Sequence, residues 1–85
     1  MMNLPSLVQV AVDELGRKRI GDIQVETAYI WAARAVAAVR LNRLAEAHEY
    51  WHEAVEHAAL AGDAVLTTLR RDASLLVPLN NLEIR

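Results

Sequence analysis

The segment from Thr27 to Val39 restricts the fold of this chain more than any other part of the sequence. It carries one charged residue, Arg34, and otherwise consists almost entirely of small, branched and aromatic apolar side chains. It belongs to a helix that we expect over about residues 23–41, and its apolar residues would cover nearly every face of that helix. A helix with so little polar surface lies either at the centre of its own bundle or against a second chain.

Turn and capping residues divide the rest of the chain into further helices. Asn42 suits a left-handed turn, Gly62 followed by Asp63 suits a helix end and a new N-cap, and Pro78 ends the last helix. The sequence therefore predicts an all-α fold, a four-helix array of antiparallel hairpins in one domain. The expected helices cover about residues 5–15, 23–41, 44–61 and 64–77, and an apolar tail that could be extended covers residues 79–85.

The size of the chain leaves little room for a large core. A chain of 85 residues forms one domain and buries only about two-thirds of its unfolded surface. It has no cysteine, which excludes a disulfide and a thiolate metal site. Hydrophobic residues nevertheless make up 54% of it, which suggests that a second chain covers some apolar surface.

The charge balance and the first residues of the sequence bear on the cellular location of the protein and on its contact with membranes. Nine basic and eleven acidic residues give a net charge of −2, which provides no general attraction to nucleic acid or acidic membranes. No basic region followed by an apolar run marks a signal peptide, and the longest apolar tract is too short to span a bilayer. We expect a cytoplasmic protein with no membrane contact.

Residues 28–61 resemble one tetratricopeptide repeat, a helical hairpin of about 34 residues. The residues that carry the resemblance have the spacing of that family: Trp31 and Ala35 in the first helix, and Ala47, Trp51 and Ala54 in the second. The sequence departs from the family pattern at four positions: Arg34, Ala38, Asn42 and Ala59. The resemblance implies a closely packed central hairpin in a protein that binds other proteins.

One group of polar residues in the helix expected over residues 44–61 has the spacing of a metal site. His48, Glu49 and His52 include a Glu-x-x-His pair, as in di-iron bundles, but the sequence has no second such pair and a solvated helix face is the simpler interpretation. A metal-binding bundle is therefore a secondary alternative. No Gly-x-Ser-x-Gly or glycine-rich phosphate loop is present, so we expect no catalytic residues and no cofactor.

The basic residues offer a second alternative function. A small dimeric regulator could bind nucleic acid through Arg17, Lys18 and Arg19 together with Arg70 and Arg71. Three basic residues in a connector are usually a solvated loop, and the chain as a whole is slightly acidic. The sequence therefore favours a protein partner over nucleic acid.

The aromatic residues and the tail supply the expected partner surface. Trp31 and Trp51 are predicted to fill the core, because the chain has no phenylalanine. The expected partner contacts are Tyr29, Tyr50, Leu79, Leu82 and Ile84. The favoured function is a non-catalytic protein–protein interaction module, such as an adaptor, a small chaperone or an assembly subunit, that forms homo-oligomers.

Overall fold

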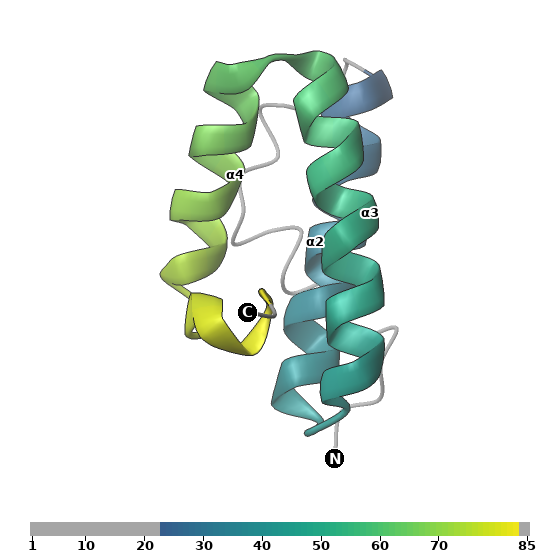
Figure 1. The fold of residues 1–85 in the computed structure, drawn as a ribbon, viewed down its shortest axis with the longest axis vertical. Coiled ribbons are helices and arrows are strands. Elements are labelled where there is room, and N and C mark those ends of the chain that lie inside the picture. The colour runs from purple at the N-terminus through teal and green to yellow at the C-terminus, as the bar shows by residue number, and fades with distance from the viewer. Residues whose placement is uncertain (1–22, 84–85) are drawn as a thin grey trace.

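The computed structural model describes residues 23–83, and this part of the chain contains three α-helices packed against one another. Helix α2 covers Ile23–Arg40, α3 covers Leu44–Ala61 and α4 covers Asp63–Ser74. Successive helices run in opposite directions (Figure 1). The all-α prediction is confirmed, and residues 23–83 contain three α-helices. The helix expected over residues 5–15 lies outside the described residues.

The turn between α2 and α3 follows the local prediction. Asn42 has φ of 60°, the left-handed conformation that ends many helices. The N–H of Arg43 donates to the carbonyl of Ala38 at 2.8 Å, and the N–H of Asn42 donates to that of Val39 at 2.9 Å. These two bonds form a Schellman motif, which satisfies carbonyls that the end of a helix would otherwise leave unpaired.

Helix α2 is the most deeply buried of the three helices. Nine of its residues are buried: Val25, Ala28, Tyr29, Ala32, Ala33, Ala35, Val36, Ala37 and Ala38. Along α3, the alanines at positions 47, 54 and 58 are fully buried, and small side chains of this kind allow two helices to approach closely. A single chain thus covers α2, so the apolar faces of this helix do not by themselves require a second copy.

The junction between α3 and α4 corrects one part of the capping prediction. Gly62 has φ of 129° and ψ of 159°, and its N–H donates to the carbonyls of Ala58 and Ala59. Asp63 is the first residue of α4 and makes no side-chain cap, so the predicted N-cap role is wrong. Its carboxylate lies in the first turn, where the helix dipole favours a negative charge.

The end of the chain folds back on the helices instead of extending away from them. Helix α4 ends at Ser74, three residues earlier than predicted, and the Ser74 hydroxyl bonds to the carbonyl of Arg71 at 2.6 Å. After Pro78, a short 3₁₀ helix, η2, covers Leu79–Asn81. The tail, which the sequence allowed to be extended, is therefore not extended as far as residue 83, and its residue Leu79 packs against the core. Figure 1 shows this segment, in yellow, turning back from α4 toward the α2–α3 pair.

None of the described helices has both the length and the apolar character needed to cross a membrane.

Candidate interaction groove

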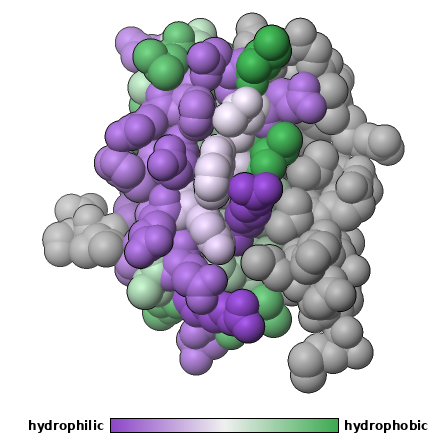
Figure 2. All heavy atoms as spheres, turned by 90° about the vertical axis from the view of Figure 1, so that its right-hand side faces the viewer, coloured by the Kyte–Doolittle hydropathy of each residue, from purple (hydrophilic) through white to green (hydrophobic). Residues whose placement is uncertain are grey.

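An open groove runs along α3. Its walls are mostly apolar, and carboxylates and imidazoles stand among them. The residues that line it are Trp31, His48, Glu49, Tyr50, Trp51, His52, Glu53, Val55, Leu82 and Glu83. We call this surface the α3 groove. Figure 2 views the molecule from the side of α3 and shows mainly hydrophilic side chains with a paler strip down the middle.

Aromatic rings from two helices meet at the α3 groove. The rings of Trp31 on α2 and Tyr50 on α3 are 5.8 Å apart between centroids and tilted by 36°, and both side chains are half-buried. The guanidinium of Arg34 lies 4.7 Å from the centroid of the Trp31 ring, within the range of a cation–π interaction. This contact explains how a charged residue is accommodated in the otherwise uncharged segment 27–39 of α2. The Tyr50 hydroxyl donates to Glu46 at 3.4 Å, which is a long and exposed contact.

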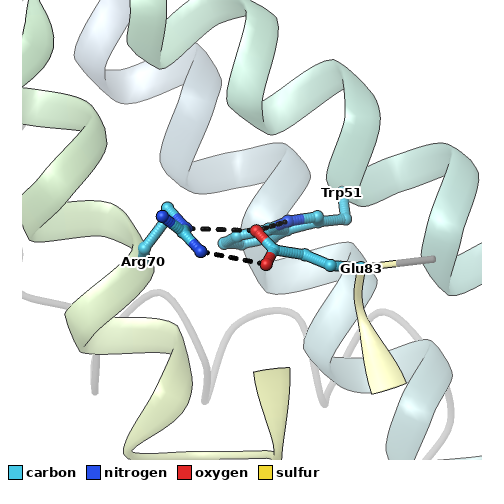
Figure 3. Close-up of polar contacts among 3 residues, drawn as sticks. All are labelled: Trp51, Arg70 and Glu83. Atoms are coloured by element: carbon cyan, nitrogen blue, oxygen red, sulfur yellow. Dashed lines mark hydrogen bonds and ion pairs between the residues drawn. The ribbon is translucent and has the colours of Figure 1, made fainter. Parts of the chain in front are cut away.

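A second set of contacts, centred on Glu83, forms another wall of the groove. The Glu83 carboxylate accepts a hydrogen bond from Trp51 Nε1 at 3.2 Å and two from the Arg70 guanidinium, at 3.0 and 3.1 Å. Figure 3 shows Glu83 between Arg70, which comes from α4, and Trp51, which comes from α3. The Arg70 contact is bidentate, a geometry that adds direction as well as attraction. The carboxylate therefore links both helices to the end of the chain.

The structure separates the predicted partner residues into different environments. Tyr29 is only 6% exposed and donates its hydroxyl to Asp72 Oδ2 at 2.9 Å, so its placement on the surface is wrong. Leu82 is 1% exposed and packs into the core, whereas Tyr50 and Leu79 are half-buried. Ile84 lies outside the described residues.

The two tryptophans also differ from each other. Trp51 is 3% exposed, which confirms its predicted place in the core. Trp31 is only partly buried and lies at the edge of the core against Tyr50, so the prediction for it is wrong. The pair that reaches the surface is therefore Trp31 with Tyr50, not Tyr29 with Tyr50. The cause is the direction from which α4 packs, because Tyr29 faces Asp72 on that helix.

The candidate metal ligands do not converge within the described part of the chain. Residues 23–83 contain no group of three or more His, Cys, Asp or Glu side chains arranged to hold a metal ion. His52 instead contacts Glu56 on the same helix, at 2.8 Å from Nε2 to Oε1. His48 and Glu49 line the α3 groove beside it.

The candidate phosphate-binding arginines are both paired with carboxylates. Arg70 bonds to Glu83, and Arg71 lies 3.3 Å from Asp72 Oδ1. Nucleic-acid binding through these side chains would compete with the two contacts. Arg17, Lys18 and Arg19 lie outside the described residues.

Sequence reasoning missed the role of Glu83. It lies 32 residues from Trp51 and 13 from Arg70, so neither contact follows a helical spacing. The apolar neighbours Leu79 and Leu82 were the only sequence signal that this segment packs against something.

Comparisons of the chain with protein-family models, with curated proteins and with solved structures found no match.

Proposed function

We propose that this chain is a non-catalytic protein–protein interaction module, an adaptor, small chaperone or assembly subunit that associates with copies of itself. The observation that carries the proposal is the α3 groove, where half-buried rings and apolar side chains stand next to carboxylates. Aromatic side chains with one covered and one open face are the residues on which protein interfaces most often depend.

The character of the central hairpin supports the same function. Helices α2 and α3 pack through fully buried alanines such as Ala35, Ala47 and Ala54, which are positions of the tetratricopeptide pattern. We propose that α2 and α3 correspond to one unit of that kind. Proteins built from such hairpins bind partners on extended surfaces and seldom perform chemistry.

Exposed apolar residues support self-association in particular. Ile23 is 79% exposed, Leu60 73% and Leu75 77%, and each lies near an end of a helix. Single exposed apolar residues are ordinary on a protein surface. With Leu44, which is 40% exposed, there are four large ones within 61 described residues, and together with an open groove they favour a contact surface on this small domain.

The test is the mass of the full chain in solution, measured by light scattering behind size exclusion at increasing concentration. We expect a dimer or larger species whose fraction rises with concentration. Tyr50→Ala removes a groove ring and should lower that fraction, whereas Thr67→Ala, an exposed change on α4 outside the groove, should leave it unchanged. A monomer at every concentration would exclude self-association and leave only a different protein as the partner.

The nucleic-acid alternative is tested separately by salt. Phosphate-driven binding weakens steeply as salt is added, because counterions are released on binding. A labelled duplex that shows no shift with the chain even at low salt would remove this alternative. The arginine–carboxylate pairs described above give no observation in its favour.

A further inference from the structure

Helices α3 and α4 are joined at Gly62, and away from this junction the space between them is filled by residues 77–82. Val77 is 6% exposed and Leu82 1%, and Leu79 packs against the same core. The segment therefore inserts apolar side chains between two helices in the way that a bound peptide does. We call residues 79–83 the tail segment, and the surface of α3 and α4 that receives it the tail site.

The tail site has two parts. One is the apolar surface that buries Leu82, which we call the apolar seat, and the other is the set of hydrogen-bond donors to the Glu83 carboxylate, which we call the clamp. Leu82 supplies the buried anchor, and the adjacent Glu83 supplies the carboxylate. The donors to that carboxylate, Trp51 Nε1 and the Arg70 guanidinium, come from two different helices. The tail site thus holds an apolar residue and the acidic residue that follows it.

The connection between α4 and the tail segment is short and not helical. Residues 75–78 link Ser74 to the tail segment, and Pro78 is extended with φ of −61° and ψ of 132°. Four residues span at most about 14 Å. A change in the backbone angles of residues 75–78 therefore changes the direction in which the tail segment leaves α4. The contacts of Leu82 and Glu83 do not depend on which copy of the chain supplies them.

The ion pair of the clamp can be released at modest cost, whereas the hydrogen bond from Trp51 Nε1 has to be made again with another carboxylate. The Arg70 side chain is 49% exposed and that of Glu83 is 33% exposed, so water replaces their contact when the segment leaves. The buried leucine then needs another apolar seat. The tail site of a second copy offers the same seat and the same donors.

We propose that the tail site is a self-recognition site, and that copies of this chain associate by exchanging tail segments. Residues 79–83 of each copy then occupy the tail site of the other, with Leu82 in the apolar seat and Glu83 between Trp51 and Arg70. Exchange of identical elements is a low-cost route to a dimer because it reuses contacts already made within one chain. This inference rests on the proposed self-association and names the segment that mediates it.

Charge reversal in the full chain tests the exchange directly. Arg70→Glu and Glu83→Arg each place like charges face to face within a single chain. When the two variants are mixed, the carboxylate of one tail segment meets the arginine of the other copy, and the introduced charges also match. We expect the mixed dimer to form with an affinity about tenfold or more above that of either variant with itself. Native mass spectrometry distinguishes the mixed dimer by its mass.

The doubly reversed chain, Arg70→Glu with Glu83→Arg, is the matched control. It restores the opposite charges within one chain, although not the hydrogen bond from Trp51 Nε1, and should therefore show no preference for a mixed dimer with the wild type. Both reversed side chains are partly exposed, and circular dichroism checks that each variant keeps its helices. A mixture that shows no preference for the mixed dimer would overturn the exchange.

The self-association of the wild type provides a second measurement that does not depend on charge reversal. In an exchanged dimer Leu82 makes the same contacts as in the monomer, so Leu82→Ala should lower the stability of both forms and change the dimer fraction little, as should Thr67→Ala on the exposed part of α4. A wild-type dimer whose reversed variants show no preference for the mixed dimer would refute the exchange and leave self-association standing. A wild type that is monomeric at every concentration would refute both.

Discussion

Replacing Trp51 by alanine tests whether the core is organised as described. The indole is 3% exposed, and its neighbours on the same face of α3, Ala47 and Ala54, are fully buried methyl groups. Side chains this small cannot move into the space that the ring leaves. A Trp→Ala change in a core costs about 3–5 kcal/mol, and we expect a value in the upper half of that range.

Such a loss is large compared with the stability of a small domain. Native domains are typically stable by about 5–15 kcal/mol, and short chains lie near the lower end. A loss of about 4 kcal/mol lowers the ratio of folded to unfolded chains nearly a thousandfold. We therefore expect Trp51→Ala to be largely unfolded, or to unfold at very low urea concentration.

The assay is urea denaturation followed by far-ultraviolet circular dichroism, because the substitution removes a fluorophore. Trp51→Phe is the matched control, since it keeps most of the ring and removes the N–H that bonds to Glu83. It should cost about 1–3 kcal/mol, less than the alanine variant. A loss below about 1 kcal/mol for Trp51→Ala, typical of a surface change, would refute the placement of this ring in the core.

Three further substitutions test single contacts. Tyr29→Phe removes the hydroxyl that donates to Asp72. It should lower the free energy of unfolding, measured by urea denaturation, by about 1–2 kcal/mol. Unchanged stability would contradict the contact. Gly62→Ala forces a side chain into a backbone conformation that essentially only glycine adopts. It should lower the free energy of unfolding by about 1–3 kcal/mol, which a thermal melt shows as a lower midpoint. A midpoint equal to that of the wild type would count against that conformation. Arg34→Met should cost about 0.5–1 kcal/mol, and a double-mutant cycle with Trp31→Leu should show that the loss depends on the ring.

The central hairpin could be predicted from the sequence because local rules determine it. The observed α3 has the predicted bounds, α2 ends one residue earlier than expected, and Asn42 makes the turn in a left-handed conformation. Apolar content, a run without glycine or proline, and one turn residue are all properties of neighbouring positions. They act before any long-range contact forms.

The orientation of α2 could not be predicted in the same way. Since its apolar residues lie all round the helix, periodicity does not indicate which face meets which neighbour. The interpretation placed Tyr29 outside and Trp31 inside, whereas the structure buries Tyr29 and leaves Trp31 partly buried at the edge of the core. The deciding contact joins Tyr29 to Asp72, 43 residues away, so it depends on how α4 packs.

The candidate site shows the same division between local and long-range signals. The sequence identified Tyr50, His48 and His52 on α3 as notable residues, and all three line the groove. It did not pair Arg70 with Glu83, because the two residues are joined by a change of chain direction at residues 75–78. A proline predicts that a helix ends but not where the chain goes afterwards.

The described contacts divide the molecule into two parts that are held together by different interactions. Helices α2 and α3 meet through small apolar side chains, which need close approach and tolerate few changes of volume. Helix α4 and the tail segment are instead attached through directed polar pairs, Tyr29 with Asp72 and Glu83 with Arg70 and Trp51, in addition to their apolar anchors. A directed pair can be exchanged for an equivalent one from another chain, whereas a close-packed helical contact cannot be exchanged without unfolding. Under the exchange proposed above, the tail segment is therefore the part of the fold that recognises a partner while the central hairpin is kept.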